Sequence, residues 1–252
     1  MPLPVGVAER REERLGKQPS VRLGTSDRDL SPLAAALLGY WQSSRPAITA
    51  PGPLETDHDF MGFPPALYQL RYPAEATEAL VAAVEACLPV SPERVARGLD
   101  HGAWMPLLMA WPDAEVPVVQ LALDRRASPA QLYHIGQALQ DLRAQGILVI
   151  GSGGTVHNLG ALLPEGSPTP GWAREFDDWL AQVLEAGDMD RLMDFRRAAP
   201  HSAMAHPTDE HFRPIFLAAG AGDADAHTLH ATFSYGSIGM RMIAFGEGER
   251  TG

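Results

Sequence analysis

The sequence predicts an α/β fold: a single domain with a central, mostly parallel sheet that is flanked by helices. Residues 147–150 form an unbroken apolar run, and residues 116–123 form a second run that is apolar at nearly every position. Such runs are typical of strands that are buried on both faces of a parallel sheet. Residues 129–145 lie between the two runs and carry apolar side chains at helical spacing. This order indicates a βαβ step, for which a right-handed crossover is expected.

Three further helices are predicted from spacing and capping signals. Residues 75–88 place apolar side chains at helical spacing and are followed by prolines. Residues 172–185 form an amphipathic pattern whose aromatic side chains we expect to face the core. A helix is also expected to begin near Thr208, which would be its N-cap, with acidic residues in the first turn.

The domain organisation follows from a change in composition near residue 30. Residues 1–29 include a densely charged stretch whose composition fits either a solvated helix or a disordered segment. No internal repeat or second boundary is visible in the rest of the chain. We therefore expect one atypical N-terminal segment, residues 1–29, and one domain, residues 30–252.

Charge and cysteine content limit the partners and the compartment. The formal net charge is −11, which argues against nucleic acid and anionic membranes as partners. Cys87 is the only cysteine, so no disulfide can form within one chain. The sequence has no apolar stretch of transmembrane length and no signal-peptide core, which predicts a cytoplasmic protein. The oligomeric state cannot be deduced.

A glycine-rich segment follows the apolar run at residues 147–150. Gly151, Gly153 and Gly154 are followed closely by His157. Ligands bind beyond the carboxyl ends of strands in open α/β sheets, so His157 is a candidate metal ligand or acid–base group. The alternative is a tight strand-to-helix turn without a ligand. A phosphate-binding loop is not indicated, because no G-x-x-x-x-G-K-[ST] pattern is present.

Other histidines lie in segments that are rich in polar and aromatic residues. His58 begins an aromatic loop, where it could equally be a packed histidine whose hydrogen bonds are satisfied. His101 follows Asp100, and this pair could be a helix cap with a surface histidine rather than a catalytic pair. A metal cluster is a further possibility for three histidines within eleven residues, namely His201, His206 and His211.

Five stretches together resemble the DOPA 4,5-dioxygenase family of class III extradiol ring-cleavage enzymes. Their order and spacing fit the family over roughly the last three-quarters of the chain. The resemblance implies a non-haem metal site, described as Fe(II) for activity and sometimes found with zinc. It also implies a small-molecule catechol substrate that is cleaved with O2. The stretches are HDFMGFPPALYQLRYP, DHGAWMPL, WPDAEVPVVQLAL, GSGGTVHNL and HPTDEHFRPI.

The resemblance assigns roles to four histidines in the predicted catalytic domain. The histidine of GSGGTVHNL is His157 and that of PTDEHF is His211, and both match metal ligands of the family. The histidine of DHGAW is His101, which matches a second-sphere acid–base residue. His58 matches an active-site histidine. In this family the metal brings the catecholate oxygens and O2 together while a histidine moves protons.

The chain departs from the family in its N-terminal part. Two further metal histidines are expected there, in HGSP and SAHW motifs, but no HGSP occurs and Tyr40 stands at the SAHW histidine. Three alternatives follow: an active dioxygenase, in which His206 or His58 could replace a missing ligand; a degenerate binding or scaffold protein; and an N-terminus that differs from the natural one.

Overall fold

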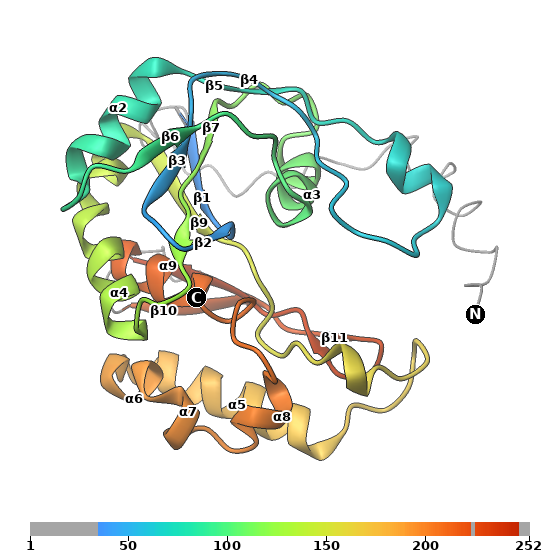
Figure 1. Cartoon of the computed structure of the whole chain (residues 1–252). Coiled ribbons are helices and arrows are strands. Elements are labelled where there is room, and N and C mark those ends of the chain that lie inside the picture. Colours follow the sequence, from blue (N-terminus) through green and yellow to red (C-terminus); the bar gives the residue numbers. More distant parts are fainter. Residues whose placement is uncertain (1–34, 223–224, 247–252) are drawn as a thin grey trace, which may run out of the picture. The chain divides into compact units, whose positions relative to one another are not determined.

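A three-stranded parallel sheet lies at the centre of the computed structural model, which describes residues 35–222 and 225–246 (Figure 1). Strand β1 (Ala35–Gly39) is in the middle, between β7 (Val118–Gln120) and β9 (Ile147–Gly151). Every residue of β1 is buried, as expected of an apolar strand inside a parallel sheet. The predicted α/β class with a parallel sheet is confirmed.

Strand β9 corrects one detail of the prediction. Residues 147–150 do form a strand, but it is not buried on both faces: Ile147 is buried, whereas Leu148 is 42% exposed. The reason is the strand order. The central place belongs to β1, and β9 pairs with β1 alone within the described part of the chain.

Short strands extend the architecture on both sides of the central sheet. Two of the additional pairs are parallel (β2 with β8, β3 with β6), and three are antiparallel (β4 with β5, β10 with β13, β11 with β12). Strands β10 and β11 lie between the central sheet and the layer of helices formed by residues 171–205 (Figure 1). The bounds are β2 Gln42–Ser43, β3 Ala47–Thr49, β4 Gly52–Leu54, β5 Ala74–Ala76, β6 Glu93–Val95, β8 Leu123–Asp124, β10 Ala226–His230, β11 Phe233–Ser234, β12 Ile238–Gly239 and β13 Met242–Phe245.

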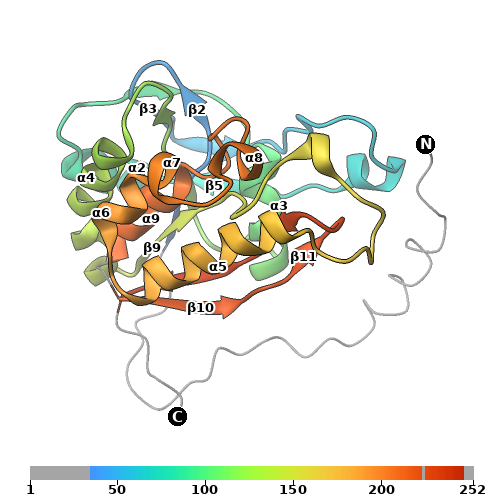
Figure 2. The ribbon, with the colours of Figure 1, turned by 90° about the horizontal axis from the view of Figure 1, so that it is seen from below.

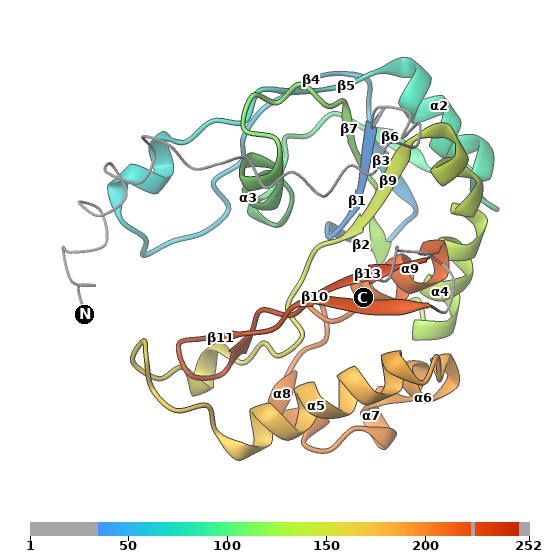
Figure 3. The ribbon, with the colours of Figure 1, turned by 180° about the vertical axis from the view of Figure 1, so that it is seen from behind.

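Helices cover the sheet from two sides, with α2 and α4 on one side and α3 on the other (Figures 1 and 3). Helix α9 packs between α4 and β9. The contact of α4 with α9 is close because Gly136 and Gly220 face the backbone of the opposite helix, where a Cβ atom would collide. The bounds are α2 Glu78–Cys87, α3 His101–Ala110, α4 Pro129–Ala138, α5 Gly171–Glu185, α6 Met189–Met193, α7 Phe195–Ala198, α8 Ser202–Ala205 and α9 Pro214–Gly222.

The helix predicted over residues 129–145 is divided. Its α-helical part begins after the N-cap Ser128, whose side chain forms a capping box with Gln131. After Ala138 the chain continues as a 3-10 helix, η2 (Gln140–Gln145). The predicted stop at Gly146 is confirmed, because this residue has a φ of 73°, which suits glycine.

A second layer is built on α5, which runs beside β10 and packs against α6 and α8 (Figure 2). The amphipathic pattern of residues 172–185 is confirmed, because Phe176, Trp179, Leu180 and Val183 are all buried. Phe176 joins an aromatic cluster that contains Phe195, Phe212 and Phe216. The aromatic stripe of α5 is therefore part of the core, as predicted.

Two predictions concern the chain as a whole. Residues 35–222 and 225–246 belong to one compact unit, while the charged segment predicted at residues 1–29 lies outside the described residues. None of the helices in the described ranges has the length and apolar character that a membrane span requires.

Candidate functional site

The glycine-rich segment after β9 brings two distant histidines together. The backbone N–H of Gly154 donates to the carbonyl oxygen of His211 at 2.9 Å. Gly153 lies so close to the same carbonyl that a Cβ atom would collide with it. The rings of His157 and His211 are stacked with centroids 3.6 Å apart and planes inclined by 18°. Gly153 is thus needed for a close approach of two backbone segments, which carry the two stacked imidazoles.

Both rings are partly buried, and this burial controls their charge. Burial lowers the pKa of His157, although the nearby carboxylate of Glu210 opposes the shift. Burial and the neighbouring His157 ring lower the pKa of His211 to about 4. Both imidazoles are therefore neutral near pH 7, which is the form that binds metal ions.

The helix predicted to carry His211 near its beginning is not found at that place. The helix expected to begin near Thr208 does not start there: the chain forms turns up to Arg213, and α9 begins at Pro214. The Thr208 hydroxyl donates to the Glu210 side chain at 2.8 Å. His211 consequently lies in a turn before α9, where its carbonyl oxygen can accept from Gly154.

Tyr40 lies next to this histidine pair. It follows the last residue of β1, and its ring centroid is 5.5 Å from that of His211 and 5.4 Å from that of His101. Gly102, in the first turn of α3, makes room for the phenol ring, because a Cβ atom there would overlap Tyr40. The carboxyl ends of the parallel strands β1 and β9 therefore lead to one cluster of aromatic and imidazole side chains.

His101 is the first residue of α3 and is held from the loop after β4. The backbone N–H of His101 donates to Asp59 Oδ1 at 2.9 Å, and the ring Nδ1 lies 2.9 Å from the same oxygen. Burial alone would raise the pKa of Asp59, but the hydrogen bonds from His101 bring it below its usual value. On the other side of the ring, Nε2 lies 3.3 Å from the Tyr40 hydroxyl.

His58 occupies a neighbouring aromatic cluster. Its ring contacts Phe60, Tyr68 and Trp104, at centroid distances between 5.6 and 5.9 Å. Its Nε2 lies 3.1 Å from the carbonyl oxygen of Leu70. Phe60 also contacts the ring of His101, at 6.0 Å. His58 thus belongs to the side of the site formed by α3 and is separated from His101 by an aromatic ring.

His201, His206 and His211 do not form a cluster. His201 is exposed, and its Nε2 lies 2.8 Å from Glu175 Oε2. His206 is fully buried, and its Nε2 lies 2.8 Å from the carbonyl oxygen of Thr155. Burial lowers the pKa of His206 to about 4. The three histidines thus have different partners, so the metal cluster considered from the sequence is not formed.

The donor set around His157 and His211 is short of a complete metal site. No group of three His, Cys, Asp or Glu side chains with metal-binding geometry is found among residues 35–222 and 225–246. Catalytic zinc and non-haem iron sites use three protein ligands. Burial and the nearby carboxylate of Asp100 raise the pKa of Tyr40, so its phenol stays protonated. Within the part of the chain that the structure describes, His157 and His211 therefore fit two ligand positions, and no side chain fits a third.

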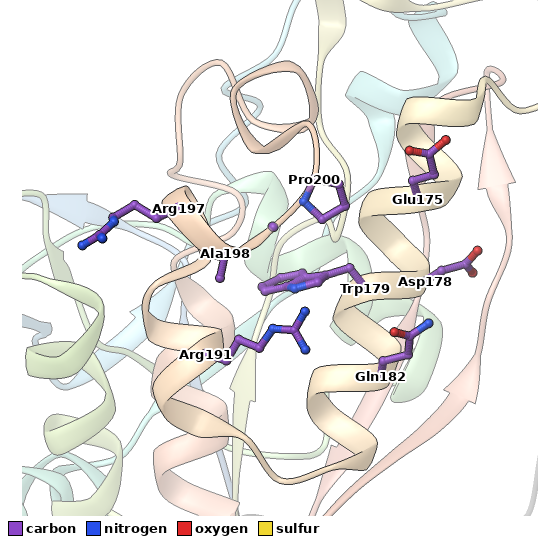
Figure 4. Close-up of a pocket in the computed structure, with 9 residues that line it drawn as sticks. Glu175, Asp178, Trp179, Gln182, Arg191, Arg197, Ala198 and Pro200 are labelled. Carbon is purple, nitrogen blue, oxygen red and sulfur yellow. The ribbon is translucent and has the colours of Figure 1, made fainter.

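An open pocket lies elsewhere, between α5 and the segment containing α6 and α7 (Figure 4). The indole ring of Trp179 lies between Arg191 and Pro200. Two acidic side chains of α5, Glu175 and Asp178, also line the pocket. None of the four candidate histidines lines this pocket. It is therefore separate from the candidate site.

Sequence reasoning missed Asp59 as a partner of His101. Asp100 precedes His101 in the sequence, and its side chain caps α3 by accepting from the N–H of Ala103, which is the capping alternative considered for this pair. It also accepts from Gln120 at 3.2 Å. The sequence does show an acidic residue, Asp59, in the aromatic loop that begins with His58. That Asp59 contacts His101 is visible only in the folded chain.

The chain is similar to known proteins over most of its length. Residues 57–246 match the family model described as the catalytic LigB subunit of aromatic ring-opening dioxygenase. A 4,5-DOPA dioxygenase extradiol of Beta vulgaris is 34% identical over 210 residues, covering 79% of this chain and 78% of the relative. A protein of the same name from Escherichia coli K12 is 34% identical over 218 residues, covering 82% and 79%. A crystal structure of an uncharacterized protein from Escherichia coli K12 has a TM-score of 0.66 and 28% identity, covering 84% of this chain and 85% of the other.

Proposed function

The chain belongs to the family of the catalytic LigB subunit of aromatic ring-opening dioxygenases, and on this premise we propose that it cleaves a catechol-type aromatic ring with O2. One observation carries the proposal. Two neutral, stacked imidazoles, His157 and His211, lie beside an acid–base candidate, His101, beyond the carboxyl ends of the parallel strands. The catalytic domain would comprise residues 30–252. The cytoplasmic location and the absence of nucleic-acid partners stay predictions from composition.

The proposed metal is Fe(II), with zinc as the other candidate. Dioxygenases of this family work with a non-haem metal. Neutral imidazole suits either ion, so His157 and His211 are the residues that would hold it. Because this pair provides two donors and the third position is not supplied among the described residues, we expect weaker binding than a complete site gives.

His101 is proposed as the acid–base residue. Ring opening of a catechol requires a proton to leave one hydroxyl group and to be returned to the product, and histidine is suited to both steps. The side chain of His101 is 32% exposed, so a small molecule can approach it from solvent. His58 is proposed to act from the aromatic cluster of Phe60 and Trp104, in which Phe60 also contacts the ring of His101.

Anaerobic titration with Fe(II), read as iron retained per chain after desalting, tests the metal part of the proposal. We expect retained iron in the unmodified protein and none in His157→Ala or His211→Ala. The matched control is His201→Ala, which removes an exposed histidine paired with Glu175 and should leave the iron content unchanged. Equal iron in all variants would exclude the proposed ligands.

Oxygen uptake with a panel of catechols then tests the reaction. Consumption of one O2 per ring opened, dependent on His157 and on His101, is the expected result. Retained substrate binding without oxygen uptake would instead identify a binding protein that keeps the fold of the family.

A further inference from the structure

Three side chains from separate parts of the sequence form a continuous hydrogen-bonded line at the candidate site. Asp59 comes from the loop after β4, His101 from the first turn of α3, and Tyr40 from the end of β1. Asp59 Oδ1 lies 2.9 Å from His101 Nδ1, and His101 Nε2 lies 3.3 Å from the Tyr40 hydroxyl. The line ends next to His211, whose ring is 5.5 Å from that of Tyr40.

The direction of these hydrogen bonds follows from the chemistry of the carboxylate. Asp59 Oδ1 also accepts from the backbone N–H of His101, and an ionised carboxylate has no proton to donate. Nδ1 of His101 must therefore carry the proton, which leaves Nε2 of the neutral ring as an acceptor. The Tyr40 hydroxyl is then the donor in the second hydrogen bond.

The surroundings hold this line in place. The absence of a side chain at Gly102 lets the Tyr40 ring lie against the first turn of α3. Trp104, in the same turn, is fully buried, and its Nε1–H donates to the carbonyl oxygen of Asp57 at 2.9 Å. The loop that carries Asp59 is thereby tied to the helix that carries His101.

Resting on the proposed function, we propose that Asp59 is a positioning residue that fixes the tautomer of His101, and that the Tyr40 hydroxyl relays a proton between the substrate and His101. The Tyr40 hydroxyl lies beside His101 Nε2, and its ring faces His211. Tyr40 is thus the side chain that contacts both the His211 ring and His101 Nε2.

The proton balance of the relay is simple. The substrate O–H bond breaks as its proton moves to the Tyr40 oxygen, and the original Tyr40 O–H bond breaks as an Nε2–H bond forms. The result is a substrate oxyanion, an unchanged phenol and an imidazolium ion beside the Asp59 carboxylate. The reverse transfer returns the proton to the opened product, so the relay requires no additional reactant.

Nitrogen-15 NMR of histidine-labelled protein, recorded at alkaline pH where imidazole is neutral, tests the tautomer without requiring activity or metal. We expect His101 to be the Nδ1–H tautomer in the unmodified protein. Asp59→Ala should produce the Nε2–H tautomer in part, whereas Asp59→Asn, which keeps an acceptor oxygen, should preserve the original state. His201 is the internal reference, because its Nε2 faces Glu175 and its signals should not change in either variant.

The same spectra test the hydrogen bond from Tyr40. Tyr40→Phe keeps the ring against Gly102 and removes only the hydroxyl, so the His101 Nε2 signal should move toward that of a nitrogen that accepts no hydrogen bond. An Nε2–H tautomer of His101 in the unmodified protein would overturn the proposal. So would an unchanged tautomer in Asp59→Ala, or an unchanged Nε2 signal in Tyr40→Phe.

Kinetics separate the relay from a purely structural role. In Tyr40→Phe, kcat with a catechol should fall roughly 100-fold while KM changes little, because acid–base catalysis contributes about 10²–10⁴-fold. An unchanged or higher kcat would overturn the relay and indicate that Tyr40 obstructs His101. If the unmodified protein cleaves no catechol, the proposed function fails, and the NMR results still decide the arrangement of Asp59, His101 and Tyr40.

Discussion

Replacing Tyr40 with histidine should convert an incomplete metal site into a stronger one. The position lies at the carboxyl end of the central strand, and its ring faces both His211 and His101. Gly102 leaves room for an aromatic ring at this position, and imidazole is smaller than phenol. The variant Tyr40→His therefore places a third neutral nitrogen donor beside the stacked His157–His211 pair.

The size of the effect can be bounded from known metal sites. Loss of a residue that merely supports a ligand costs about 10–100-fold in affinity, so gain of a ligand should tighten Fe(II) binding by at least about that factor. This corresponds to roughly 1.4–2.7 kcal/mol. Two bound imidazoles release few protons because burial already keeps both His157 and His211 neutral, so the gain should be visible at pH 7.

The assay is anaerobic titration of Fe(II), repeated with Zn²⁺, for the unmodified protein and for three variants. Tyr40→Phe is the matched control, because it removes the phenol oxygen without adding a donor, and its dissociation constant should stay near that of the unmodified protein. Adding His157→Ala to Tyr40→His should cancel the gain. Equal dissociation constants for Tyr40→His and Tyr40→Phe would show that position 40 does not face the metal-binding pair.

Two predictions concern stability. Gly153→Ala places a methyl group against the carbonyl oxygen of His211 and should lower the free energy of unfolding by about 1–3 kcal/mol in urea titrations. Gly160→Ala is the control, because Gly160 is exposed and has only one tight contact, so the free energy of unfolding should change much less. Equal effects of the two variants would refute the close approach at Gly153 as the cause. Arg241→Met leaves the buried carboxylate of Asp177 without its 2.6 Å ion-pair partner and should lower the free energy of unfolding by about 3–5 kcal/mol. Replacing the exposed Arg45, which pairs with Glu93, should lower it by less than about 1 kcal/mol. Similar losses for both variants would mean that burial of the Arg241–Asp177 pair is unimportant for stability.

The fold class could be predicted because it depends on local patterns. The apolar run at residues 147–150, the helix that begins at Pro129 and the amphipathic helix at residues 172–185 each carry their signal within a few turns of chain. The place of β9 in the sheet carries no such signal. It depends on β1, which precedes it by more than a hundred residues and takes the central position.

The candidate site was predictable as a set of residues and not as an arrangement. His157 and His211 were chosen by family resemblance, but their stacking arises from the contact of Gly153 and Gly154 with the His211 carbonyl. For Asp100 the sequence left open a helix cap or a pair with His101, and it gave no sign of the carboxylate that holds the His101 ring. Asp100 is needed as the cap of α3, and the ring of His101 is held by Asp59 across a turn of the fold.

Tyr40 bears on both metal binding and proton transfer at the candidate site. As a protonated phenol it leaves the His157–His211 pair without a third donor, and as a hydroxyl beside His101 Nε2 it is suited to carry a proton. These two properties predict opposite consequences for one substitution: Tyr40→His should strengthen metal binding and, by removing the hydroxyl, interrupt the relay to His101. If both metal affinity and kcat rise together, the phenol only occupies the place of a ligand. If affinity rises while the proton-transfer step slows, this chain uses position 40 for acid–base chemistry in a site that binds its metal through fewer residues.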